Sequence, residues 1–121
     1  MIDKDYKIIL PLTLDGLSKY ADLYDVTMCN DDNARILVVS GTDFENMNLD
    51  MFCLDLYKKY GFLLGDGDYY FLDCNDCKLL KEHMITNADN VRTQLSSCLY
   101  ETLLNFCDEA IKLNTGIGFD F

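Results

Sequence analysis

The chain contains one proline, one histidine and no tryptophan among its 121 residues. Because His83 is the sole imidazole, any site that needs two histidines is excluded. Basic residues are also few: ten lysines and arginines face 21 acids, for a net charge of −11. Such a charge repels nucleic acid and anionic membrane surfaces and favours basic partners, although it also serves solubility by itself.

Long apolar runs are absent as well. No run approaches the 18 or so residues that a membrane-spanning helix needs. The first residues carry several charges, and only the short apolar run 8–10 precedes Pro11, which does not fit a secretory signal. We therefore expect a cytoplasmic protein in which the six cysteines are reduced thiols, several of them core residues.

The residues that are present suit a single globular domain over 1–121, with 50% hydrophobic residues and no linker or repeat. The strongest pattern lies between 87 and 113, with residues of one face spaced three and four apart. This face consists of Val91, Leu95, Cys98, Leu99, Thr102, Phe106, Ala110 and Leu113. The pattern predicts one helix of about 25 residues, roughly 38 Å long, that ends before Gly116 and forms one wall of the core.

Other segments have clear local signals. Residues 6–10 predict a strand that Pro11 closes. Three shorter helices are predicted from apolar spacing and N-cap residues. They cover 14–24 with Thr13 as cap, 49–60 with Asn48 as cap and Gly61 as stop, and 74–84 with Asp73 as cap.

The remaining segments predict a first hairpin. Two β-like runs, 26–29 and 35–40, flank the turn-forming stretch 30–33. The continuous apolar run 36–39 favours a central strand. Residues 41–47 are expected to form a loop.

A second hairpin is predicted from 62–64 and 69–72, which flank the Gly-Asp-Gly-Asp stretch 65–68. The end of the chain, 117–121, either docks as a short strand or stays loose. The order of elements predicts an α+β fold, a small and mainly antiparallel sheet with two hairpins packed against helices. A mixed α/β sandwich is the alternative.

Cys74 and Cys77 form the sharpest local motif, a pair separated by two residues between a predicted strand and a predicted helix. Redox chemistry there needs a thiolate, which the neighbouring Asp73 and Asp76 oppose. Zinc needs about four ligands, and the chain has no second such pair and one histidine. Two small residues at a helix start explain the pair equally well.

Other catalytic and cofactor motifs are incomplete. Asp66-Gly67-Asp68 lacks the later calcium ligands of an EF-hand loop. No serine lies in a nucleophile elbow, and no glycine-rich phosphate loop follows a strand. The sequence therefore predicts no catalytic residue, no metal and no cofactor.

The small size, the negative charge and the lack of catalytic motifs together predict a binding protein that inhibits a basic protein partner. Immunity proteins that neutralise nuclease toxins are the leading hypothesis, because an acidic surface complements a phosphate-binding cleft. A phage-type protein that mimics nucleic acid and blocks a defence enzyme is the second hypothesis. A small thiol- or zinc-dependent enzyme using Cys74 and Cys77, and a subunit of a larger complex, are further alternatives.

Acids near the two predicted turns are the candidate contact residues for this partner. No lysine or arginine occurs between Gly61 and Cys77, so the charge there is not neutralised locally. If the hairpin tips meet at one edge of the sheet, the acids form one surface. The predicted contact residues are Asp31, Asp32, Asp66, Asp68, Asp73 and Asp76.

Overall fold

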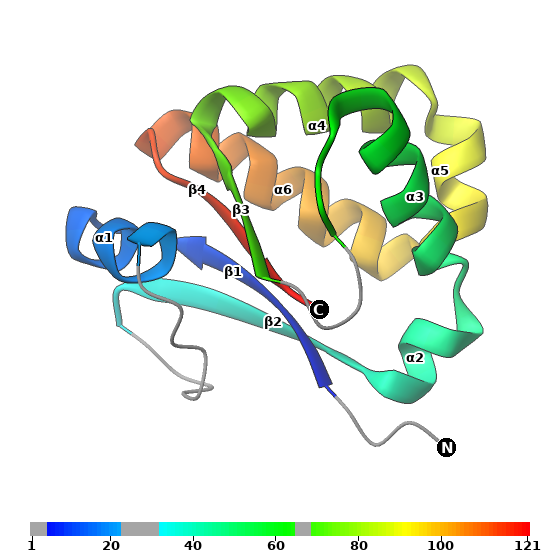
Figure 1. The fold of residues 1–121 in the computed structure, drawn as a ribbon, viewed down its shortest axis with the longest axis horizontal. Helices are drawn as coiled ribbons and strands as arrows, with labels where there is room; N and C mark the ends of the chain where they lie inside the picture. The colour runs from blue at the N-terminus through cyan, green and yellow to red at the C-terminus, as the bar shows by residue number, and fades with distance from the viewer. Residues whose placement is uncertain (1–4, 23–31, 65–68) are drawn as a thin grey trace.

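The computed structural model describes residues 5–22, 32–64 and 69–121, and for residues 19, 21 and 22 it describes the backbone alone. The described chain has the expected α+β fold, with an antiparallel sheet between helices (Figure 1). The strand order is β2-β1-β4-β3, and every pair is antiparallel. The strands are β1 Asp5–Pro11, β2 Ala34–Ser40, β3 Tyr69–Asp73 and β4 Gly116–Asp120.

Helices cover both faces of this sheet. Successive strand residues point to opposite faces, so Ile8 and Ile9 belong to different layers, and both are buried. Ile8 lies in the larger core cluster with residues of α3, α4 and α6, whereas Ile9 packs with Tyr20 of α1 and Ala34. The helices are α1 Leu14–Asp22, α2 Gly41–Asn46, α3 Leu49–Tyr60, α4 Cys74–Thr86, α5 Ala88–Gln94 and α6 Ser97–Leu113.

The predicted helix over 88–113 is divided in two, which corrects the sequence analysis. Leu95 has an extended backbone, with φ −119° and ψ 149°, and it ends α5. Ser96 then caps α6, because its side chain accepts a hydrogen bond of 3.1 Å from the Leu99 N–H. The apolar spacing continues through the break because Val91, Leu95 and Leu99 are all buried. Periodicity alone therefore conceals the corner, although α6 remains the longest described helix.

The strand pairing also differs from the predicted hairpins. β2 pairs along its full length with β1, and α1 lies between them in sequence. In the described sheet β2 is an outer strand, whereas the sequence analysis predicted a central one. The other half of the first hairpin, 26–29, lies outside the described residues.

The second predicted hairpin is wrong in its first strand. Residues 62–64 have no strand conformation, and Phe62 and Leu64 are buried by side-chain packing instead. β3 pairs with β4, about 45 positions later in the chain, so the partner was not its sequence neighbour. The predicted loop at 41–47 is mostly the helix α2, which Ser40 caps by accepting a hydrogen bond from the Asp43 N–H.

The predicted caps at Thr13 and Gly61 are confirmed. Asn48 lies at the N-cap position of α3, but its side chain makes no capping hydrogen bond there and donates instead to the Thr93 carbonyl at 3.4 Å. Thr13 accepts a 3.0 Å hydrogen bond from the Gly16 N–H at the start of α1. Gly61 ends α3 with a φ of 78°, a conformation that glycine adopts easily. The C-terminal segment docks as β4, an inner strand between β1 and β3.

Candidate functional site

Three of the six predicted contact acids, Asp31, Asp66 and Asp68, lie outside the described residues. Asp32 precedes β2 and is exposed, and Asp73 ends β3 and is exposed. The start of β2 and the end of β3 lie at the same end of the sheet, because Ala34 pairs with Pro11 and Asp73 pairs with Gly116. Two strands lie between β2 and β3, a separation of about 14 Å at the usual strand spacing.

Asp73 and Asp76 cap the start of α4. The Asp73 carboxylate accepts a 2.8 Å hydrogen bond from the Asp76 N–H, and the Asp76 carboxylate accepts one of 3.3 Å from the Asp73 N–H. This reciprocal pair is a capping box. Burial raises the pKa of Asp76. Of the described predicted acids, Asp32 alone has no capping role, and whether any of the six contacts a partner stays a prediction.

The second predicted turn, 65–68, lies outside the described residues, and Tyr69, which follows it in sequence, pairs with Asp120. That pairing lies at the end of the sheet opposite to Asp32 and Asp73. The structure therefore brings Asp32, Asp73 and Asp76 to one end of the sheet, and it places the residue that follows the second turn at the other end.

Cys74 and Cys77 have the contacts of packed cysteines. Cys77 is fully buried, its Sγ donates to the Leu72 carbonyl at 3.7 Å, and burial raises the pKa of its thiol. The half-buried Cys74 Sγ donates to the Ile111 carbonyl at 3.9 Å. A raised thiol pKa disfavours the thiolate that redox chemistry and zinc binding need. Within the described ranges, no group of three or more His, Cys, Asp or Glu residues is placed to hold a metal ion.

His83 is buried between aromatic rings and is not placed as an open imidazole base. Its ring centroid lies 6.2 Å from that of Phe52 and 6.0 Å from that of Tyr60. Its Nδ1 lies 3.4 Å from the Asn87 amide nitrogen, and its Nε2 has no hydrogen-bond partner among the described atoms. Burial, and less strongly the charge of Lys59, lowers the pKa of His83.

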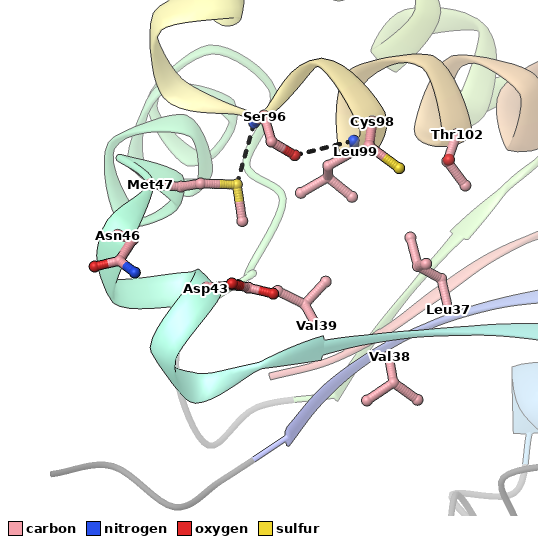
Figure 2. A pocket seen from close by; sticks show the side chains of 10 residues that line it. All are labelled: Leu37, Val38, Val39, Asp43, Asn46, Met47, Ser96, Cys98, Leu99 and Thr102. Atoms are coloured by element: carbon pink, nitrogen blue, oxygen red, sulfur yellow. Dashed lines mark hydrogen bonds between the residues drawn. The ribbon is translucent and has the colours of Figure 1, made fainter.

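The structure contains a feature that the sequence analysis missed, a groove of about 380 Å³ between β2, α2 and the start of α6 (Figure 2). Most of its lining is apolar, and among the described residues that form it Asp43 is the only charged one. The assignment of 41–47 to a loop concealed one wall of this groove. The lining residues are Leu37, Val38, Val39, Asp43, Asn46, Met47, Ser96, Cys98, Leu99 and Thr102.

Capping residues hold the walls of the groove together. Ser40 caps α2 directly after β2, so the helix turns away from the strand without a linker. On the opposite wall, Ser96 caps α6, and its backbone N–H donates to the Met47 sulfur at 3.1 Å. Figure 2 shows this contact bridging the end of α2 and the corner before α6. The groove is therefore built by residues that also fix the ends of two helices.

The chemistry of the groove combines apolar contact area with one negative charge. Figure 2 shows Leu37 and Val39 pointing toward α6 and Val38 pointing the opposite way. The exposed Asp43 carboxylate makes no hydrogen bond or ion pair with any described residue. Such a groove suits an apolar group that carries a cation next to it.

A second, more polar cavity of about 550 Å³ lies near the start of α4. Cys74 is among its lining residues, but no described histidine is, so the described lining offers no cysteine–histidine pair. The cavity is lined by Leu17, Ser18, Phe71, Asp73, Cys74, Asn75, Asn114 and Thr115.

Comparisons with protein-family models, with curated proteins and with solved structures found no match to this chain. None of the described helices has the length and apolar character needed to cross a membrane. The exposed acids and the groove beside β2 are therefore interpreted from their own chemistry.

Proposed function

We propose that this protein is a small acidic binding protein that inhibits a basic protein partner, as immunity proteins neutralise nuclease toxins. The observation that carries this proposal is the surplus of 21 acids over ten bases. Most of the described acids are exposed, so their charge is available to a partner. The exposed ones are Asp5, Asp15, Asp32, Asp43, Glu45, Asp50, Asp73, Glu82, Asp89, Glu101 and Asp108.

Charge complementarity supplies the physical reason. A nuclease keeps a basic cleft for phosphate groups, and an acidic surface complements that cleft. The attraction raises the association rate and disfavours wrong partners. Two ion pairs join described residues: Lys81 lies 2.5 Å from Asp108, and Arg92 lies 3.7 Å from Glu101. Both pairs are substantially exposed, so each contributes little to stability.

The burial pattern favours the immunity-protein hypothesis over a nucleic-acid mimic. A protein that acts by charge alone can work with less core. Here Ile8 and Ile9 are buried on opposite faces of β1, and a second small cluster supplements the main one. Such a protein acts in the cytoplasm, where a nuclease toxin threatens the cell that makes it.

The test has two steps. The tagged protein captures its partners from the source cell, and mass spectrometry identifies them. Each captured basic protein is then purified and assayed for nuclease activity with increasing amounts of this protein. We expect activity to vanish at about one equivalent, and the association rate to fall as salt rises, because salt screens attraction between opposite charges.

The alternatives predict different results. A nucleic-acid mimic competes with DNA for a defence enzyme and protects phage DNA instead of the cell. A thiol- or zinc-dependent enzyme loses its effect when Cys74 and Cys77 are both changed to serine. Partners that are not basic, or basic partners whose activity is unchanged at a tenfold excess of this protein, overturn the proposal.

A further inference from the structure

The two outer strands of the described sheet, β3 and β2, differ in how their free edges are covered. At the β3 edge, the segment after α3 approaches the strand, and the rings of Phe62 and Tyr70 lie 6.1 Å apart. At the opposite edge of the sheet, no strand in the described ranges pairs with the outer side of β2. Edge strands of natural sheets usually carry a charge, a proline or a cover that prevents further pairing. Between Arg35 and Ser40, β2 has none of these residues.

The groove lies along this edge. Side chains of successive strand residues point to opposite faces, so the side chains above one face come from every second residue. The groove contacts three consecutive residues, Leu37, Val38 and Val39, which come from both faces. Because the Val38 side chain points away from α6 (Figure 2), the place of Val38 in the lining fits a groove that reaches the open side of β2, where outward backbone N–H and C=O groups lie.

The surroundings of the edge favour a cationic, extended occupant. Val38 is 42% exposed at the edge. Asp43 of α2 is exposed and lines the groove, and Glu45 of the same helix is also exposed. The cation nearest in sequence is Arg35, near the far end of β2, so it does not neutralise this acidic side.

We propose that an extended segment of the basic partner pairs with the outer edge of β2 as an additional strand. One side of this segment places apolar side chains in the groove, against Leu37, Leu99 and Met47. A lysine or arginine of the segment meets the Asp43 carboxylate. Main-chain hydrogen bonds supply affinity in this mode, and the alternating side chains supply specificity. The inference rests on the proposed function, because that function supplies a basic partner.

The first experiment tests the edge itself with synthetic peptides. A blocked heptapeptide of alternating valine and lysine is titrated into the full protein, and backbone amide resonances are followed by NMR. We expect shifts concentrated at Leu37, Val38, Met47 and Leu99. A heptapeptide of alternating valine and glutamate should bind at least tenfold more weakly, because its charges face Asp43.

Matched variants separate the groove from general attraction to an acidic protein. Asp43→Asn removes the charge in the groove, and Asp50→Asn removes an exposed charge from the first turn of α3. We expect the first to weaken peptide binding about three- to tenfold and the second to leave it nearly unchanged. N-methylation of every second amide of the valine–lysine peptide should abolish binding, because those amides pair with β2.

A thiol at the groove provides an independent block. Cys98 is exposed and lines the groove. Reaction with a bulky maleimide should reduce peptide binding at least tenfold in the wild type. The same treatment of Cys98→Ser should have little effect, because the other thiols within the described ranges lie outside the groove lining.

The outcomes distinguish this inference from the proposed function. Equal binding of the two peptides, shifts confined to other regions, or full protection of the β2 amides from exchange in the free protein overturns the inference. A dimer that pairs β2 with β2 also overturns it. If a basic nuclease is inhibited while maleimide on Cys98 has no effect, the proposed function stands and the docking mode falls. If the peptide pairs with β2 but every captured basic partner stays active, the reverse holds.

Discussion

At the scale of single residues, Phe106 shows how α6 contributes to stability. It is 2% exposed and lies in the main core cluster. Phe106→Ala removes a ring from a closely packed site and should lower the free energy of unfolding by about 3–5 kcal/mol. Urea denaturation measures this change. The matched control on the same helix is Leu113→Ala, which is 38% exposed and should cost well under half as much. Similar losses below about 0.5 kcal/mol for both variants would contradict the packing of α6.

His83 predicts a dependence of stability on pH. Burial lowers its pKa in the folded protein below the ordinary value of 6.5. The unfolded chain therefore binds the proton more readily, and stability falls as pH decreases from about 6.5 toward the lowered pKa. We expect the free energy of unfolding to fall more between pH 7.5 and 5.5 in the wild type than in His83→Gln.

His83→Gln is a suitable comparison because its side chain stays neutral over this range while the carboxylates titrate equally in both proteins. Lower pH also reduces repulsion among the many acids, so the difference between the two proteins is the informative quantity. A larger acid destabilisation in His83→Gln than in the wild type would contradict the lowered pKa of His83.

At the scale of elements, the corner between α5 and α6 can be tested by whether one substitution raises or lowers the free energy of unfolding. Ser96 caps α6, so Ser96→Ala should lower the free energy of unfolding by about 1 kcal/mol. In an uninterrupted helix the same change would stabilise, since alanine is the better helix former. Ser97→Ala, at the first helical position, serves as the control and should be nearly neutral. If Ser96→Ala stabilised the protein, the result would contradict the corner and support a single helix over 88–113.

Elements also explain which acids are suitable for charge reversal. Asp73 and Asp76 form the capping box of α4, so reversing them mixes folding with binding. Asp32 is exposed and makes no hydrogen bond or ion pair within the described part of the chain. It is therefore the cleanest of the predicted contact residues on which to begin.

At the scale of the whole molecule, the net charge of −11 predicts salt-dependent association. Reversing Asp31 and Asp32 together, and Asp66 and Asp68 together, should slow association with the identified basic partner and flatten its dependence on salt. Stopped-flow or surface-binding kinetics at two salt concentrations measure both quantities. Far-UV circular dichroism and urea unfolding verify the fold. Unchanged rates and salt slopes in both variants, with the fold intact, would mean that binding uses another surface.

Several features that depend on neighbours in sequence could be predicted from the sequence, although the helix α2 and the corner before α6 could not. The strand closed by Pro11, the helix from Leu49 to Tyr60 with Gly61 as its stop, and the capping of α4 by Asp73 were all predicted. Apolar spacing and caps act within one or two turns, so they can be read locally. The same holds for the charge, which depends on composition alone.

Strand partners and the groove were decided by tertiary structure. β3 pairs with a strand about 45 residues away, and no local signal encodes that choice. The corner at Leu95 was hidden because a buried residue keeps the helical spacing even where the helix stops. The groove brings β2 and α2 against the start of α6, about 50 residues further along, so it exists only after the sheet and helices have packed. Packing selects among pairings that local propensities leave nearly equal in free energy, and so it sets the surface a partner meets.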